Sequence, residues 1–297
     1  MKVPNLDSLV PTEMSPRLCE LQGISWDALS SVDQCSDLAT TIGAVWEIAY
    51  PSLVRVDMLK INPVVHHLVV FLYSLEAGAS AGRAAESKPL DAIWMCRLLT
   101  LAQVHDSSAE LKITQKQVRD VRERDKAAGD ILDLRRRAAR WRHLGEGTAN
   151  AVELLSLANH ILGPRGYDYD AIERIVLDCS RHDYPSLGIP IPDDKESLLP
   201  IFVECDSLWM ISYPHGPRAD LLRDEKTPSP AELINQIRCN VTSIASRCGV
   251  KEPTYEGLTR LPRTRAIAKR NLDLWAKELG VAVGEFFPPQ RATRKTK

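Results

Sequence analysis

The stretch LLTLAQVHDSS, residues 98–108, runs an apolar segment directly into an adjacent His105-Asp106 pair. Apolar residues up to the pair recur at the spacing of one helical face: Ile93, Cys96, Leu99 and Val104. Pro89 suits the first turn of such a helix, because the amide hydrogen that proline lacks has no partner there. Helical spacing recurs along nearly the whole chain, and no convincing run alternates as a strand does. The sequence therefore predicts an all-α fold.

Prolines, glycines and changes in charge divide the chain into four predicted segments. Residues 1–50 form a leader and a helix, and residues 51–225 form the main helical domain. Residues 226–287 form a C-terminal helical segment that packs on that domain. Residues 288–297 form a disordered basic tail.

Within the main domain, the charged stretch 112–142 predicts one or two partly exposed helices. Residues 145–162 predict a separate helix, which Gly163-Pro164 ends.

Composition excludes several classes of protein. The 297 residues carry a formal charge of −1, which fits neither a uniformly basic nucleic-acid coat nor an acidic disordered chain. The seven cysteines lack the paired spacing of a zinc cage and are expected to be reduced thiols. The N-terminus lacks the features of a signal peptide, and the apolar stretch near residues 64–75 is too short to span a bilayer. We expect a cytoplasmic protein with no membrane contact.

Histidines and aspartates follow a fixed order along the chain: His66, His105-Asp106, His143, His182 and Asp206. This order resembles that of the HD superfamily of metal-dependent phosphohydrolases. Three stretches beyond the His-Asp pair also resemble it: HLGEGTANAVELLSLANHIL from residue 143, IERIVLDCSRHDYPSLG from residue 172 and LLPIFVECDSLWMIS from residue 198. The resemblance covers Pro63 to Ser212. It implies an HD-domain-like helical bundle with additional N- and C-terminal helices.

The resemblance also implies a cofactor of one or two divalent metal ions. His66, His105, Asp106 and Asp206 hold the first ion in this scheme, while His143 and His182 complete the second and Asp106 bridges the two. The expected metal is Mn, Fe, Ni, Co, Zn or Mg. Metal-activated hydroxide then attacks the phosphorus of a phosphorylated small molecule or nucleotide, which makes Asp106, His143 and His182 the catalytic candidates.

The chain departs from the family pattern in three places. Ser107-Ser108 follow the pair where the family often has Gly-Lys, so no phosphate-contacting lysine is carried over. His66 and His67 compete for the first ligand position, and the apolar offsets that follow favour His66. The stretch between Asp106 and His143 is long for the family, which a helical insertion would explain.

Three side chains are candidates for substrate binding: Arg140, Arg181 and Trp209. Arginine can hold a phosphate through two parallel hydrogen bonds, and both arginines stand close in sequence to a candidate ligand histidine. Trp209 follows the last candidate ligand by three residues and is placed to line a pocket. The alternatives are a solvated helical face for the arginines and a core position for the tryptophan.

Other interpretations use the same residues differently. Each histidine taken alone is more often an ordinary core or surface residue. A mixed-valent di-iron oxygenase has six such ligands, and the identity of the metal distinguishes it from a hydrolase. A vestigial site would leave a scaffold that only binds partners, although the retention of all six ligand types argues against it. The oligomeric state stays open.

The C-terminal segment suggests a different class of protein. TSIASRCGVKEPTYEGLTRL (242–261), followed by NLDLWAKELGVAVGEFF (271–287), resembles a Cro/repressor-type helix-turn-helix. A recognition helix would then follow the Gly249-Val250 turn. The basic residues from Lys226 onward would serve a nucleic-acid partner. The alternative is that residues 262–279 are a late packing helix of the bundle.

Overall fold

The computed structural model describes residues 63–79, 92–106, 131–162, 169–192, 197–221 and 227–288. The regular elements among these residues are all helices, which confirms the predicted all-α class. No helix in these ranges is long and apolar enough to cross a membrane. The predicted leader and helix of residues 1–50, and residues 289–297 of the predicted tail, lie outside the described residues.

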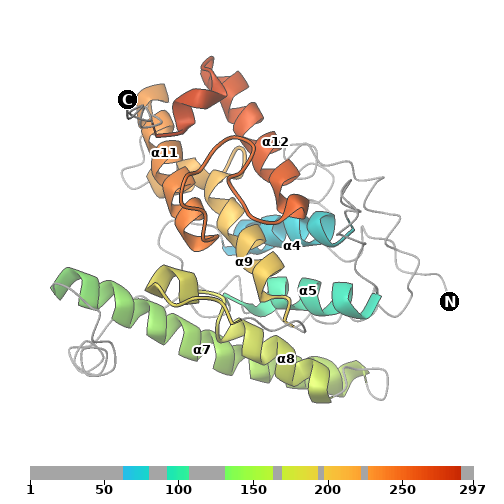
Figure 1. Cartoon of the computed structure of the whole chain (residues 1–297). Coiled ribbons are helices and arrows are strands. Elements are labelled where there is room, and N and C mark those ends of the chain that lie inside the picture. The colour runs from blue at the N-terminus through green and yellow to red at the C-terminus, as the bar shows by residue number, and fades with distance from the viewer. Residues whose placement is uncertain are drawn as a thin grey trace, which may run out of the picture.

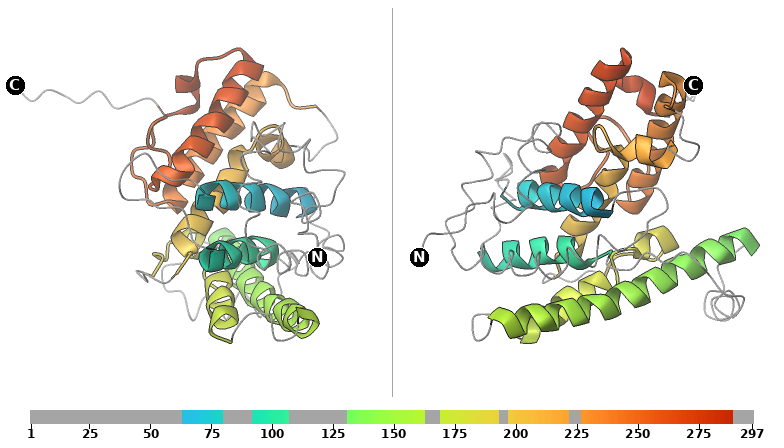
Figure 2. Two further views of the ribbon diagram at one scale, coloured as in Figure 1. Left: turned by 90° about the vertical axis from the view of Figure 1, so that its right-hand side faces the viewer. Right: turned by 180° about the vertical axis from the view of Figure 1, so that it is seen from behind.

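The longer helices are stacked in layers. Helices α7 (Ile131–Leu162) and α8 (Tyr169–Cys179) lie side by side along one edge of the molecule (Figure 1). Helices α4 (Pro63–Ala79), α5 (Ala92–Val104) and α9 (Leu199–Leu208) occupy the middle, and α11 (Pro230–Arg247) and α12 (Pro262–Leu279) the opposite edge (Figure 2). Short elements connect or follow them: η4 (Tyr184–Leu187), η5 (Trp209–Ile211), α10 (Gly216–Leu221) and η7 (Val283–Phe286).

Prolines and a capping box mark where several helices begin. Pro63, Pro230 and Pro262 are the first residues of α4, α11 and α12. Proline is tolerated at this position because the first amide groups of a helix have no partner within it. At α11 the Ser229 side chain accepts from the Glu232 amide, and the Glu232 carboxylate accepts from the Ser229 amide. Local sequence therefore sets these helix starts.

Helix α4 lies at the centre of the core. Every residue from Leu68 to Tyr73 is fully buried, so this stretch has no solvent-facing side. A helix that is apolar all round belongs in a protein interior. Helix α4 contacts α5, α9 and α12, and one continuous apolar core joins them to α11. His66 in the first turns of α4 is thereby fixed at the edge of this core.

The C-terminal helices pack on the rest of the bundle. Helix α12 contacts α4 and α9, and α11 contacts α9. The Arg270 guanidinium on α12 donates to both carboxylate oxygens of Glu76 on α4, at 2.5 and 2.7 Å. The Asn271 side-chain amide exchanges hydrogen bonds with the Tyr73 hydroxyl in the buried interface. These contacts join α11 and α12 to the other helices, while the division of the chain into domains stays a prediction.

Helix α7 differs from the prediction of separate helices on either side of residue 143. It runs without interruption from Ile131 to Leu162, through Gly145 and Gly147. A glycine in a helix interior costs about 1 kcal/mol relative to alanine, which packing against neighbouring helices can offset. Contacts with α8 and α5 provide that packing. The described part of α7 extends to Leu162, and the predicted stop at Gly163-Pro164 lies outside the described residues.

The helix-turn-helix resemblance is wrong at its central element. Residues 248–261, which follow α11, form turns and bends and contain no helix. Pro253 and Gly257 interrupt this stretch, and each disfavours a continuous helix. No recognition helix follows the Gly249-Val250 turn, and residues 262–279 form the packing helix α12 instead.

Candidate metal centre

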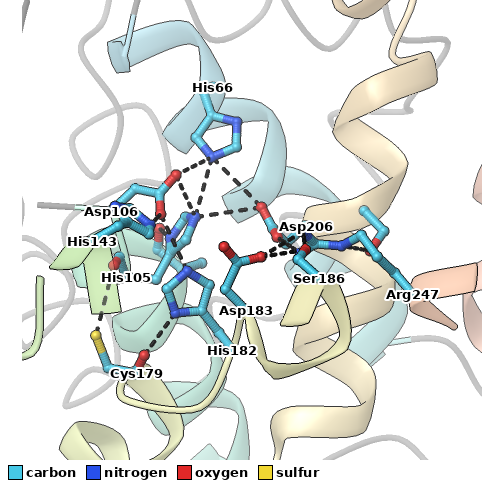
Figure 3. Close-up of polar contacts among 12 residues, drawn as sticks. His66, His105, Asp106, His143, Cys179, His182, Asp183, Ser186, Asp206 and Arg247 are labelled. Carbon is cyan, nitrogen blue, oxygen red and sulfur yellow. Dashed lines mark hydrogen bonds and ion pairs between the residues drawn. The ribbon is translucent and has the colours of Figure 1, made fainter. Parts of the chain in front are cut away.

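Side chains from five segments of the chain converge on one place between the layers (Figure 3). His66 comes from α4, and His105 and Asp106 directly follow the end of α5. The other three come from α7, the turn after α8, and α9: His143, His182 and Asp206. All six side chains named as candidate ligands from the sequence therefore lie together.

The first group consists of His66, His105 and Asp206. The Nε2 atoms of the two histidines lie 3.1 Å apart, and Asp206 Oδ1 lies 3.6 Å from His66 Nε2 and 3.5 Å from His105 Nε2. Asp106 Oδ2 approaches the same histidines at 3.1 and 3.6 Å. Donors that share an ion at about 2.1 Å lie about 3 to 3.5 Å apart, so this group has the spacing of a metal site.

The second group consists of Asp106, His143 and His182. Asp106 Oδ1 lies 2.8 Å from His143 Nε2 and 3.3 Å from His182 Nε2. The Oδ2 atom of the same carboxylate faces the first group. Asp106 thus stands between the two groups, with one oxygen toward each, and both groups can hold a metal ion.

Backbone carbonyls orient two of the histidine rings. His105 Nδ1 donates to the Ala102 carbonyl at 3.0 Å, and His182 Nδ1 donates to the Cys179 carbonyl at 2.7 Å. A proton held on Nδ1 leaves the Nε2 lone pair free to face the cluster. Burial also lowers the pKa of His105, which favours the neutral imidazole that binds a metal.

The two carboxylates of the cluster are held in the ionised form. Burial raises the pKa of Asp106, but His105 and His143 outweigh it and hold that pKa well below its usual range. Burial also raises the pKa of Asp206, and the Arg247 guanidinium outweighs it, so the net shift is downward. Ionised carboxylates are the form that a cation binds.

The first candidate ligand position falls on His66 rather than on His67. His66 Nε2 joins the cluster, whereas the fully buried His67 belongs to neither group and packs its ring against His105 at 4.8 Å. The buried Trp209 contacts the His66 ring edge to face, with centroids 5.2 Å apart. Trp209 therefore lies against a candidate ligand, where it restricts how the imidazole can turn.

Of the two candidate substrate arginines, Arg140 contacts Asp183, and Arg181 directly precedes His182 in the chain. Arg140 donates from Nη1 to Asp183 Oδ2 at 2.7 Å while half of its side chain stays exposed. Arg181 lies partly exposed in the turn directly before His182.

Sequence reasoning missed Arg247 and Asp183. Arg247 ends α11, and its guanidinium donates to Asp206 Oδ2 at 2.6 Å and to Asp183 Oδ1 at 2.7 Å. Burial lowers the pKa of this guanidinium, but Asp206 and Asp183 raise it by more. The net shift is upward, so the guanidinium stays charged. The only sequence signal was the position of Asp183 next to His182. No feature of the sequence around Arg247 indicated that it contacts Asp206, which lies more than forty residues earlier in the chain.

Gly147 allows α7 to approach the His-Asp pair closely. A Cβ atom at this position would lie 3.1 Å from the His105 carbonyl oxygen, whereas one at Gly145 would meet nothing within 4 Å. We expect the free energy of unfolding of Gly147→Val to be about 1 to 3 kcal/mol lower than that of Gly145→Val. Both substitutions change helix propensity equally, but only the one at Gly147 crowds a neighbouring group. Urea unfolding of the two variants measures the difference. Equal stabilities would mean that α7 has room to move away.

No protein-family model, curated protein or solved structure matches this chain. The fold and the geometry by themselves define a helical protein with two adjoining groups of buried or partly buried histidine and aspartate that can hold metal.

Proposed function

We propose that this chain is a metal-dependent phosphohydrolase of the HD superfamily. The observation that carries the proposal is the position of Asp106, with Oδ2 toward His66 and His105 and Oδ1 toward His143 and His182. If each group held an ion, Asp106 would be a ligand shared by both, and two adjoining ions are the arrangement of two-metal phosphoryl-transfer sites.

The donor set supports a transition metal. Four imidazoles and two carboxylates suit Mn, Fe, Co, Ni or Zn, whereas Mg favours oxygen donors. Divalent ions held here would supply an activated water at neutral pH and positive charge for the phosphate oxygens. The chain's own part is to fix the ligand geometry, through the Ala102 and Cys179 carbonyls and the packing of Trp209.

The charges around the site favour an anionic substrate once metal is bound. The carboxylates of Asp183 and Asp206 face the guanidiniums of Arg140 and Arg247, and the Asp106 carboxylate faces the histidines. One or two divalent ions would make this group net positive, which attracts phosphate. Arg140 uses one nitrogen on Asp183 and keeps others for a substrate, so we assign it to phosphate binding. Arg181 and Trp209 are secondary candidates.

Metal content and phosphate release test the proposal together. The protein, purified without chelators or a histidine tag, is expected to hold one or two equivalents of a transition metal by inductively coupled plasma mass spectrometry. It should release phosphate from p-nitrophenyl phosphate or from a nucleotide in a panel, and chelation should remove both metal and activity. His215→Gln is the matched control, because His215 belongs to neither group.

Other outcomes point to other functions. Iron accompanied by substrate-dependent oxygen uptake, without phosphate release, would favour the di-iron oxygenase that the same ligand set allows. Absence of metal, even after reconstitution with each candidate ion, would contradict the catalytic proposal and leave a binding scaffold.

A further inference from the structure

Arg247 joins the C-terminal helix α11 to Asp206 of the first group and to Asp183, which follows His182 of the second group in the chain. Its three guanidinium nitrogens all donate to side chains near the cluster: Nε to Ser207 Oγ at 2.8 Å, Nη1 to Asp183 Oδ1 at 2.7 Å and Ser186 Oγ at 2.6 Å, and Nη2 to Asp206 Oδ2 at 2.6 Å. The Arg247 side chain is only 13% exposed. Figure 3 shows the guanidinium approaching Asp206 from the side away from the histidines.

The contact with Asp206 restricts how that carboxylate can bind. Arg247 occupies Oδ2, so that Oδ1 alone faces His66 and His105. A charge-assisted hydrogen bond of this kind is among the stronger ones in proteins. It favours a carboxylate that offers one oxygen rather than two.

The contact with Asp183 reaches the second group indirectly. Asp183 is 1% exposed, and both of its oxygens are engaged, Oδ1 by Arg247 and Oδ2 by Arg140. The Ser186 hydroxyl also donates to Oδ1, at 2.7 Å. These bonds fix the turn that carries His182, and they explain why Asp183 is not itself placed as a ligand.

We propose that Arg247 is a positioning residue of the metal centre. It holds Asp206 so that one oxygen is presented to the first ion, and it fixes the turn of His182 through Asp183. The inference rests on the proposed function only in requiring that metal binds at this cluster. Lysine cannot replace the arginine, because a single ammonium does not reproduce a planar fork with donors on three nitrogens.

The test compares Arg247→Lys and Arg247→Met with Arg238→Met. Arg238 lies on the same helix but is exposed and has no contact with the cluster. Co²⁺ titrations of the full chain should show about 10- to 100-fold weaker binding for both Arg247 variants, the range for losing an outer partner of a ligand, and no change for Arg238→Met. The visible Co²⁺ spectrum should weaken as Asp206 becomes free to bind through both oxygens.

A double-variant comparison separates positioning from general support of the fold. If Arg247 acts through Asp206, the Arg247→Lys change should weaken binding far less in an Asp206→Asn background than in wild type. Circular dichroism establishes whether each variant is folded. If Arg247→Met is unfolded, the Co²⁺ affinity of Arg247→Lys is the test. If the wild type binds Co²⁺ and the folded Arg247 variants bind it with the same affinity, this inference alone would be overturned. Absence of Co²⁺ binding by the wild type would overturn it together with the proposed function.

Discussion

Asp106→Asn is expected to empty both metal groups. The substitution removes the negative charge from the one carboxylate that faces His66 and His105 on one side and His143 and His182 on the other. Loss of a mere outer partner costs 10- to 100-fold in metal affinity, so loss of the shared ligand should cost more than about 100-fold. Metal per chain should fall to near zero, and phosphate release should fall with it.

Asp206→Asn gives the matched comparison. Asp206 faces only the first group, so this variant should keep the ion held by Asp106, His143 and His182 and lose the other. Stoichiometry by mass spectrometry on folded protein measures both variants. Full metal content in Asp106→Asn would contradict the bridging role, and equal losses in the two variants would indicate that the ions bind only as a pair.

Asp183→Ala is expected to have the largest effect on stability. Asp183 is nearly fully buried between the Arg140 and Arg247 guanidiniums. Removing one member of a buried ion pair leaves an uncompensated charge, and such changes cost about 3 to 5 kcal/mol. The lower end applies here, because Arg140 is half exposed and Arg247 keeps its bond to Asp206. The free energy of unfolding should therefore fall by about 3 kcal/mol.

Urea unfolding of metal-free protein measures this loss without interference from ligand binding. Asp273→Ala is the control, since Asp273 is an exposed carboxylate that accepts a hydrogen bond from the Tyr255 hydroxyl. A stability for Asp183→Ala near that of wild type would mean that water replaces the carboxylate easily.

The fold class and the six candidate ligands could be predicted because both leave local signals. Helical periodicity is read within a dozen residues, and it located α5 and α12 to within a few residues. The His105-Asp106 pair lies where the helix it follows was expected to end. The remaining candidate ligands were predicted from a family resemblance, which itself depends on short stretches of sequence.

Features that depend on distant contacts could not be predicted. Arg247 reads as one more charged residue near the end of an amphipathic helix, and its partners lie 41 and 64 residues away. Gly145 and Gly147 indicated a helix boundary, but packing against α5 and α8 keeps α7 continuous. The helix-turn-helix resemblance also made residues 250–261 look like part of a helical pair, while Pro253 and Gly257 disfavour a helix there.

The candidate ligands lie far apart in the sequence, so the fraction of folded protein would depend on the concentration of free metal. His66 and Asp206 stand at opposite ends of the segment that holds them, and only His105 and Asp106 are neighbours in the chain. An unfolded chain therefore offers an ion no assembled binding place, so an ion at this cluster would bind the native state almost exclusively. Each tenfold rise in free metal above the dissociation constant would then add about 1.4 kcal/mol to the free energy of unfolding. The metal status of its surroundings would thus set how long this protein survives proteolysis.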